Sequence, residues 1–309
     1  MSRGTIACMF MRIILASLVV LVSGLTAGCS ATTRTTSGSR GDARSVVVAF
    51  YPLAWLAEQL GGSSVRVTNL TPAGSEPHEL ELAPDDLAAI RDADVVLYVG
   101  RGFQPAVEAA LAGTRAVKVD VLDAPGLDLL SPRAGRAGTD ERLDVDPHVW
   151  LDPSRFAAVA RFVAPRLDAD ARPVEGTLDR LDATFRSELT GCRRHEFVTT
   201  HAAFGYLADA YGLDQVPITG VSPEAEPLPR DLERVVRQAR STHAGTIFFE
   251  PLVSSKLARQ VAHEANASAA VLDPIEGITP RRLADGVDYI HVQRANARAL
   301  HDALDCRGH

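Results

Sequence analysis

The sequence predicts an α/β protein made of two parallel-sheet lobes that are joined by a long helix. Short runs of β-branched residues alternate with amphipathic stretches, which is the pattern of parallel strands connected by helices. The same alternation occurs in both halves of the chain, and two helical stretches separate the halves. The roughly 265 residues that follow position 44 are enough for two domains of moderate size.

The first half is expected to form a lobe over residues 45–172. Its expected strands are Ser45–Ala49, Val65–Asn69, Asp94–Val99 and Ala116–Val121, and its expected helices are Leu53–Leu60, Pro84–Arg91 and Pro105–Leu111. Pro84 lies in a first helical turn that also carries Asp85 and Asp86, which suit the positive end of the helix dipole. Gly61 and Gly62 are typical of a helix end.

The second half repeats this plan over residues 192–309. Its expected strands are Glu196–Thr200, Gln215–Ile218, Thr246–Phe249 and Ala269–Leu272, and its expected helices are Ala202–Tyr211, Arg230–Arg240 and Ser255–Ala265. Between the halves we expect helices at Pro153–Leu167 and, within a linking segment 173–191, at Pro173–Leu189. Such lobes leave a cleft lined by the carboxyl ends of strands, where open α/β sheets bind ligands.

The first 29 residues have the features of a signal peptide. Arg12 precedes an apolar run, 13–22, that is too short for a comfortable membrane span. Small residues then precede Cys29, as in a bacterial lipobox whose cysteine becomes lipidated, although Thr26 stands where Leu is more usual. An ordinary signal peptide with a coincidental Cys29 is the alternative.

A flexible tether is expected over residues 30–44, which are rich in Ser, Thr, Gly and Arg and lack an apolar period. The start of translation is open between Met1 and Met11. Together these features predict an exported protein, held by a lipid anchor at the outer face of the cytoplasmic membrane or in the periplasm.

Cysteine usage and charge narrow the class of protein further. Two of the four cysteines, Cys8 and Cys29, belong to the signal region, so Cys192 and Cys306 are the pair left in the folded part. In an oxidising compartment they can form a disulfide, and two free thiols are the alternative. The net charge of −7 and the lack of a basic run argue against a nucleic-acid partner.

Five residues are candidates for a metal site because of where they stand. His201, Glu250 and Asp273 each directly follow an expected strand, and His78 and His148 each follow a proline that stiffens the loop. Three imidazoles and one carboxylate suit zinc. We expect His78, His148, His201 and Asp273 to be the ligands, whereas Glu250 either replaces Asp273 or supports a histidine from behind.

The other six histidines lack such placement and are expected at the surface or behind the ligands. His195-Glu196 and His263-Glu264 begin like the HExxH motif of metalloproteases, but neither continues with the required second histidine.

With these residues in view, the chain resembles the cluster A-I substrate-binding proteins of bacterial zinc/manganese ABC transporters. The resemblance runs from about Val46 to Cys306 and rests on the order of several short motifs. These are Ala49-Phe50-Tyr51-Pro52-Leu53, Ser75-Glu76-Pro77-His78-Glu79-Leu80-Glu81, Asp94-Val95-Val96-Leu97-Tyr98-Val99-Gly100, Asp146-Pro147-His148-Val149-Trp150-Leu151-Asp152-Pro153, Thr199-Thr200-His201-Ala202-Ala203-Phe204-Gly205-Tyr206-Leu207, Phe249-Glu250-Pro251-Leu252 and Leu272-Asp273-Pro274.

The resemblance implies a binding protein with no chemistry of its own, which captures Zn²⁺ and delivers it to a membrane permease. It also implies two lobes joined by one rigid helix, and we expect the protein to be a monomer. The family's metal positions fall on His78, His148, His201 and Asp273, and His rather than Glu at the third position goes with zinc over manganese. The cysteine pair looks like a disulfide of some members. A departure is the segment 126–146, which is short and lacks the histidines of many zinc members.

Two other functions stay open at this point. A zinc hydrolase would need an open coordination position and a general base, for which Glu250 is the candidate. A metal-dependent surface adhesin is also compatible with the resemblance, because relatives of this family are often described as adhesins.

Overall fold

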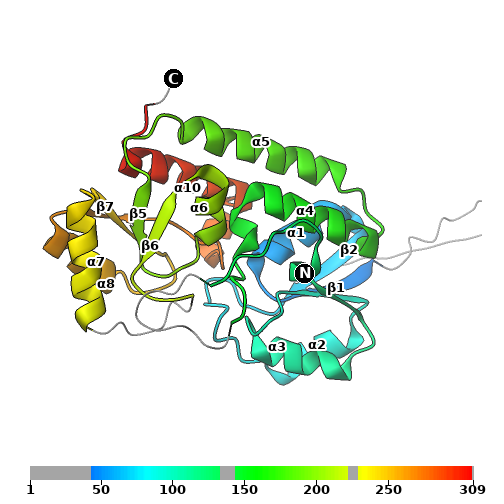
Figure 1. Cartoon of the computed structure of the whole chain (residues 1–309). Coiled ribbons are helices and arrows are strands. Elements are labelled where there is room, and N and C mark those ends of the chain that lie inside the picture. The colour runs from blue at the N-terminus through cyan, green and yellow to red at the C-terminus, as the bar shows by residue number, and fades with distance from the viewer. Residues whose placement is uncertain (1–42, 133–142, 222–228, 308–309) are drawn as a thin grey trace, which may run out of the picture. The chain divides into compact units, whose positions relative to one another are not determined.

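The computed structural model describes residues 43–132, 143–221 and 229–307 (Figure 1). The expected signal peptide, Cys29 and the tether up to residue 42 lie outside these residues, and so do residues 133–142 of the segment 126–146. Within the described residues, no helix is long and apolar enough to cross a bilayer.

The first half contains a four-stranded parallel sheet, as the alternation of strands and helices predicts. Its elements in chain order are β1 (Arg44–Val48), α1 (Tyr51–Gly61), β2 (Val65–Asn69), α2 (Pro84–Asp92), β3 (Val95–Tyr98), α3 (Pro105–Ala110) and β4 (Val117–Asp120). The strand order is β2-β1-β3-β4, and β1 pairs with both β2 and β3. β1 begins one residue inside the expected tether, since Arg44 is in register with Val65.

The second half contains a sheet of the same size and order, β6-β5-β7-β8, again with all strands parallel. Its elements are β5 (Glu196–Thr199), α6 (Gly205–Tyr211), β6 (Asp214–Pro217), α7 (Pro229–Ser241), β7 (Thr246–Phe249), α8 (Lys256–Ala265), β8 (Ser268–Val271), α9 (Pro280–Ala284) and α10 (Tyr289–Leu304). The fold class of two parallel-sheet lobes is therefore confirmed.

Two helices connect the halves, α4 (Pro153–Val163) and α5 (Arg172–Glu188). α4 begins at a proline, and the Asp152 side chain accepts a hydrogen bond from the Ser154 amide, which satisfies one of the free donors at the helix start. α5 buries Val174, Leu178, Leu181 and Phe185 on one stripe. In Figure 1, α5 runs beside α4 and α10. The lobe boundaries expected from the sequence stay predictions.

The apolar interior is arranged in layers that follow the alternation along each strand. Val47 faces a small core under α2 and α3, whereas Val46 and Val48 face the large core under α1, α4 and α5. In the second sheet, Val198 faces a separate core under α7 and α8, whereas Phe197 joins the same large core as Val46. One continuous apolar core therefore supports both sheets.

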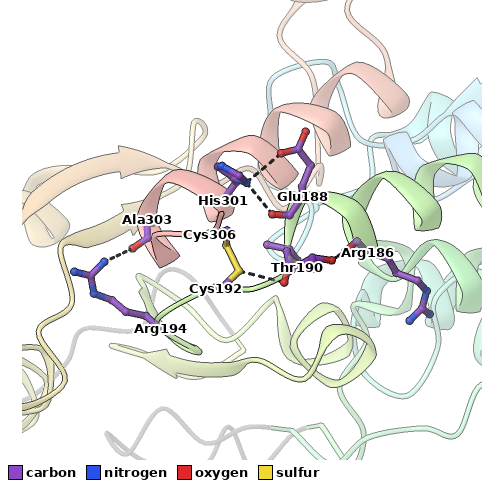
Figure 2. The surroundings of a disulfide bond; sticks show 9 residues. Arg186, Glu188, Thr190, Cys192, Arg194, His301, Ala303 and Cys306 are labelled. Carbon is purple, nitrogen blue, oxygen red and sulfur yellow. Dashed lines mark hydrogen bonds and ion pairs between the residues drawn. A yellow bond between two sulfur atoms is a disulfide. The ribbon is translucent and has the colours of Figure 1, made fainter. Parts of the chain in front are cut away.

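The disulfide between Cys192 and Cys306 is present and joins the start of the second half to the end of α10 (Figure 2). Hydrogen bonds surround it: the Arg194 amide donates to the Leu304 carbonyl at 3.1 Å. His301 Nδ1 lies 2.8 Å from the Glu188 carbonyl oxygen, across to the end of α5. The disulfide thus fixes α10 against the end of the linking helix.

α9 and α10 are additions to the elements expected from the sequence. α10 buries one stripe, made of Tyr289, Val292, Gln293, Asn296, Ala297, Leu300 and Leu304. Its start is capped by the Asp288 side chain, which accepts a hydrogen bond from the His291 amide. Because two members of the stripe are polar amides, the apolar period is interrupted in the sequence.

Candidate metal site

His78 lies in the loop between β2 and α2, and that loop is held from two sides. The His78 amide donates to Glu76 Oε1 at 3.0 Å, and Gln104 Nε2 donates to the Pro77 carbonyl at 3.0 Å. The imidazole packs edge-on against the Phe103 ring, with ring centroids 4.7 Å apart. Its side chain is 7% exposed, so the ring is presented to the site with little freedom.

His148 lies before α4 and is fully buried. Its amide donates to Asp146 Oδ1 at 3.0 Å, and its ring nitrogen Nδ1 lies 2.7 Å from the same oxygen. A carboxylate on Nδ1 fixes the ring orientation and leaves Nε2 free to act as a ligand. The Trp150 ring packs beside the imidazole, with centroids 5.0 Å apart.

His201 follows β5 and is also fully buried. Its carbonyl oxygen accepts hydrogen bonds from Thr199 Oγ1 and Gln215 Nε2, which anchor the backbone. Its Nδ1 lies 2.6 Å from Glu250 Oε1, but neither ring nitrogen has an aligned hydrogen-bond partner among the described residues. A buried imidazole without aligned partners is costly unless something else binds it.

Glu276, in the loop after β8, brings a carboxylate to these three rings. Its Oε1 lies 3.2 Å from His78 Nε2, 3.2 Å from His148 Nε2 and 3.6 Å from His201 Nε2. Four potential ligand atoms, one from each residue, lie within 4.8 Å of one another. Three imidazole nitrogens and one carboxylate oxygen in this arrangement fit a tetrahedral zinc ion.

Asp273, the expected fourth ligand, is not a member of this group and has other partners. Its Oδ2 lies 2.8 Å from Arg282 Nη1, and its Oδ1 accepts a hydrogen bond from the Ile275 amide at 2.9 Å. The Asn296 side chain bonds both the amide and the carbonyl of Asp273. The structure thus differs from the sequence-based expectation, because the carboxylate of Asp273 is used to fold the loop.

The backbone at Ile275 explains why Glu276, and not Asp273, lies beside the three histidines. Ile275 has a φ of 60°, in the left-handed region that a β-branched residue seldom adopts. It is fully buried, so the surrounding packing holds this conformation. The turn directs the next side chain, Glu276, toward the histidines. A carboxylate two residues after Pro274 was visible in the sequence, but its direction was not.

Glu250 occupies the supporting position rather than a position among the four. It contacts the far nitrogen of His201 and accepts a hydrogen bond from Thr200 Oγ1. Asp146 and Glu250 therefore play equivalent parts behind His148 and His201. Carboxylates in this position orient an imidazole and raise its basicity toward a metal.

Burial and charge shift the pKa values of the group in opposite directions. Burial acts to lower the pKa of His201, but the Glu250 and Glu276 carboxylates outweigh it and raise that pKa well above its ordinary value. Asp146 and Glu276 likewise raise the pKa of His148 against burial. Burial lowers the pKa of His78 despite Glu276. The three histidines hold the pKa of Glu276 well below its ordinary value, although burial opposes them.

A further acidic side chain, Glu76, lies at the edge of the group. Its Oε1 is 3.9 Å from His78 Nε2, and its side chain is 15% exposed. Burial and the neighbouring Glu276 raise the pKa of Glu76 to about 9. Glu76 is therefore protonated near neutral pH and adds no charge, whereas Glu276, whose pKa is lowered, supplies a negative charge among the three rings, as a site for a divalent cation requires.

The other histidines among residues 43–132, 143–221 and 229–307 belong to no group of three or more potential ligands. His291 contacts the helix-capping Asp288, and His301 contacts Glu188. These placements agree with their expected supporting or surface roles.

Two parallel-sheet lobes that contribute two potential ligands each define a two-lobed metal-binding protein. The chain matches the family model described as zinc-uptake complex component A, periplasmic (ZnuA), over residues 46–303. The chain belongs to this family.

Curated relatives agree with this assignment. The chain is 32% identical over 307 residues to the high-affinity zinc uptake system protein ZnuA of Bacillus subtilis (strain 168), covering 91% of this chain and 94% of that protein. It is also 32% identical over 281 residues to the zinc-binding lipoprotein AdcA of Streptococcus pneumoniae (strain TIGR4). That match covers 85% of this chain but only 56% of AdcA, so the chain spans about half the length of that relative.

Solved structures show the same fold. Zn(II)-bound AdcA from Streptococcus pneumoniae matches with a TM-score of 0.70 and 31% identity, over 86% of this chain and 59% of that one. The laminin-binding protein Lmb of Streptococcus agalactiae, described as bifunctional with adhesin and metal-transporting activity, matches with a TM-score of 0.74 and 28% identity, over 84% of this chain and 99% of that one.

Proposed function

We propose that this protein is the extracytoplasmic solute-binding component of an ABC importer, which captures Zn²⁺ and delivers it to a membrane permease. The observation that carries the proposal is the convergence of three buried Nε2 atoms on Glu276 Oε1. The ligands proposed are His78, His148, His201 and Glu276, with Asp146 and Glu250 behind two of them. The zinc-binding names of the curated relatives support the same metal.

Zinc fits this donor set better than manganese. Imidazole is a borderline-soft ligand that suits zinc, whereas manganese prefers an oxygen-rich set. Neither ring nitrogen of His201 has an aligned hydrogen-bond partner among the described residues, and the carboxylates of Asp146, Glu250 and Glu276 lie beside the rings. Both features favour a divalent cation. Since the ligands come from both halves, bound zinc would join the two lobes and so stabilise the fold as a whole.

The site is tested by a competitive titration of the protein from Ser30 onward against a chromophoric zinc chelator, with manganese in parallel. Glu276→Gln is expected to weaken zinc binding by more than the roughly 10–100-fold that loss of a supporting residue costs. Asp273→Asn is the matched control, because it changes a carboxylate of the same loop and should leave a much smaller effect. A larger loss with Asp273→Asn would restore the assignment made from the sequence.

The partners of the proposed ligands and of Glu250 argue against a hydrolase. The four proposed ligands fill a tetrahedral shell, which leaves no position for a catalytic water. Glu250, the candidate base, is engaged by His201 and Thr200. We therefore propose a transport protein rather than an enzyme, and hydrolysis of ester or peptide substrates by the zinc-loaded protein would contradict this.

A surface adhesin role is a second candidate, because Lmb is described with both adhesin and metal-transporting activity. Binding of the zinc-loaded protein to immobilised laminin, compared with the Glu276→Gln variant, separates a metal-dependent adhesin from a transport protein alone.

We further propose that the protein is a monomer anchored through lipidated Cys29. The lipoprotein name of AdcA supports the anchor, whereas Cys29 itself lies outside the described residues. Metabolic labelling with a palmitate analogue should be lost in Cys29→Ala, and sedimentation of the soluble form should give one chain per particle.

A further inference from the structure

Tyr206 lies in α6, in the second half, and its side chain is fully buried. Its hydroxyl donates a hydrogen bond to the Asp146 carbonyl oxygen at 2.8 Å and accepts one from the Leu130 amide at 3.1 Å. Asp146 and Leu130 also bond each other, from the Asp146 amide to the Leu130 carbonyl at 2.9 Å. The Tyr206 hydroxyl, in the second half, therefore bridges two loop positions of the first half, Leu130 and Asp146. We call this set of three hydrogen bonds the Tyr206 junction.

The Tyr206 junction lies two residues before a proposed ligand, His148. The same Asp146 whose carbonyl accepts the Tyr206 hydroxyl uses its carboxylate to hold the amide and the Nδ1 of His148. The backbone bond to Tyr206 therefore restrains the residue that orients the His148 ring. Because burial raises the pKa of Tyr206, the hydroxyl keeps its proton and can go on donating.

The other end of the connection leads to a ligand of the second half. α6 begins four residues after His201, and Ala202 to Phe204 between them are fully buried. Arg155 in α4 fixes the helix from outside: it lies over the Tyr206 ring at 5.0 Å, and it donates to Asp209 Oδ2 and to the Leu127 carbonyl. α6 is thereby attached to the first half at two points, Tyr206 and Asp209.

We propose that Tyr206 is a positioning residue for the metal site, whose hydroxyl sets the distance between His148 of the first half and His201 of the second. The inference rests on the proposed zinc site. A buried carbonyl and amide that lose this hydroxyl have to find other partners, and the loop that carries Asp146 would shift with them. The ligands would remain, but their spacing would no longer be held.

The chain offers a matched control in the same helix. Tyr211 also ends in a hydroxyl that makes one side-chain hydrogen bond, to Asp182 Oδ1 at 3.1 Å in α5. Its ring stacks on Phe185 at 5.0 Å, in the core away from the four proposed ligands. Tyr206→Phe and Tyr211→Phe remove the same atom from the same helix, and only the first touches the His148 loop.

The experiment measures zinc affinity by chelator competition and zinc dissociation by stopped flow, on the protein from Ser30 onward. Tyr206→Phe is expected to weaken zinc binding about 10-fold, mainly through faster dissociation, in the range that loss of a supporting residue produces. Tyr211→Phe is expected to bind zinc as the unchanged protein does, even if its thermal unfolding temperature falls as much.

Two further variants keep the outcome decisive. 4-Aminophenylalanine at position 206 keeps a donor to the Asp146 carbonyl and should restore most of the affinity, which a loss of fold alone would not allow. In a double-mutant cycle, Tyr206→Phe and Asp146→Asn should be strongly non-additive, because both act through His148.

Unchanged affinity and dissociation in folded Tyr206→Phe, or equal weakening by Tyr211→Phe, would overturn the inference while the zinc site stands. Failure of the unchanged protein to bind zinc, or zinc binding unaffected by Glu276→Gln, would instead overturn the proposed function.

Discussion

The two sheets have the same strand order, yet they place different chemistry at the same topological position. In each sheet the chain reverses its direction of winding between the two central strands, β1 and β3 or β5 and β7, and the loops after these strands meet there. In the second sheet this position holds His201 and Glu250, in contact at 2.6 Å. In the first sheet it holds Phe50 and Phe103, with ring centroids 5.2 Å apart.

The difference shows two ways of fixing a metal-binding histidine. The second half holds His201 from behind with a carboxylate. The first half instead provides a surface of aromatic rings, where Phe103 packs against both His78 and His148. His78 and His148 come from loops outside this central position, and their rings pack against Phe103. The same fold position is thus an electrostatic support in one lobe and an apolar support in the other.

The largest effect is expected when the apolar support at Phe103 is removed. Phe103→Ala should lower the free energy of unfolding by about 3–5 kcal/mol, as is usual for a buried Phe, because Phe103 is 2% exposed. It should also weaken zinc binding, since two histidine rings lose their packing. Chemical denaturation and chelator competition measure the two effects.

Phe185→Ala is the control for Phe103→Ala. Phe185 is equally buried in the large core but stacks on Tyr211 away from the histidines. It should cost similar stability and leave the zinc affinity of the folded protein unchanged. Equal effects of both variants on zinc would mean that the aromatic rings act only through global stability.

The next effect concerns the covalent support of the second half. Replacing Cys192 and Cys306 together by Ser should cost about 2–5 kcal/mol of unfolding free energy, because the disulfide closes a long loop. Zinc affinity should hardly change, since Cys192 lies before the amino end of β5, whereas the ligand His201 follows its carboxyl end. The measurement is denaturation of both proteins with and without zinc, and a strong drop in affinity would show that the disulfide positions ligands.

A smaller effect tests the electrostatic support. Glu250→Gln should weaken zinc binding about 10–100-fold, because the amide keeps the shape but loses the charge that raises the basicity of His201. Asp146→Asn should do the same through His148. Asp231→Asn, a fully buried carboxylate paired with Arg234 outside the site, is the control and should leave zinc affinity as it is.

The smallest effect concerns pH, and its sign differs with and without zinc. Without zinc, the raised pKa values of His148, His201 and Glu76 mean that the folded chain binds more protons than the unfolded chain. The contribution of the two histidines to stability is present below about pH 6.5, and that of Glu76 below its ordinary pKa of 4.5. Each contribution is lost as pH rises through the raised pKa, by no more than about 1.4 kcal/mol per pH unit for each group. Glu276, with a lowered pKa, contributes above its ordinary value and changes little in this window.

With zinc, the trend should reverse, because the metal binds the deprotonated histidines and its affinity grows as pH rises. Thermal unfolding between pH 6 and 9, with and without zinc, measures both trends. Calorimetry in buffers of different ionisation enthalpy should show protons released on binding. Zinc affinity that is flat with pH would contradict the three-histidine site.

The sheets and the positions of the three histidines could be predicted from the sequence. Features that depend on hydrogen-bond partners far away in the chain could not. β2 and β7 have the bounds expected from their β-branched runs, and the loops of His78 and His148 could be recognised from their prolines. α10 was missed because Gln293 and Asn296 interrupt its apolar stripe. Their partners, Trp150 and Asp273, lie far away in the chain.

The position of Glu276 beside the histidines could not be predicted for a similar reason. Asp273 and Glu276 share one loop, and the rule that ligands follow strand ends favours Asp273. Only the backbone at Ile275 and the guanidinium of Arg282 distinguish them, and neither a φ angle nor a partner nine residues away can be read from the residue types. The Tyr206 junction was equally invisible, although Tyr206 stands in a recognisable motif.

The large core that runs beneath both sheets also decides how the protein loses its structure. Val46 of the first sheet and Phe197 of the second belong to one apolar cluster, so neither sheet can be exposed without opening the same interior. Unfolding is then cooperative, with a single transition for both lobes rather than one for each. An intermediate in which one sheet stays folded while the other is lost is therefore not expected in thermal or chemical unfolding.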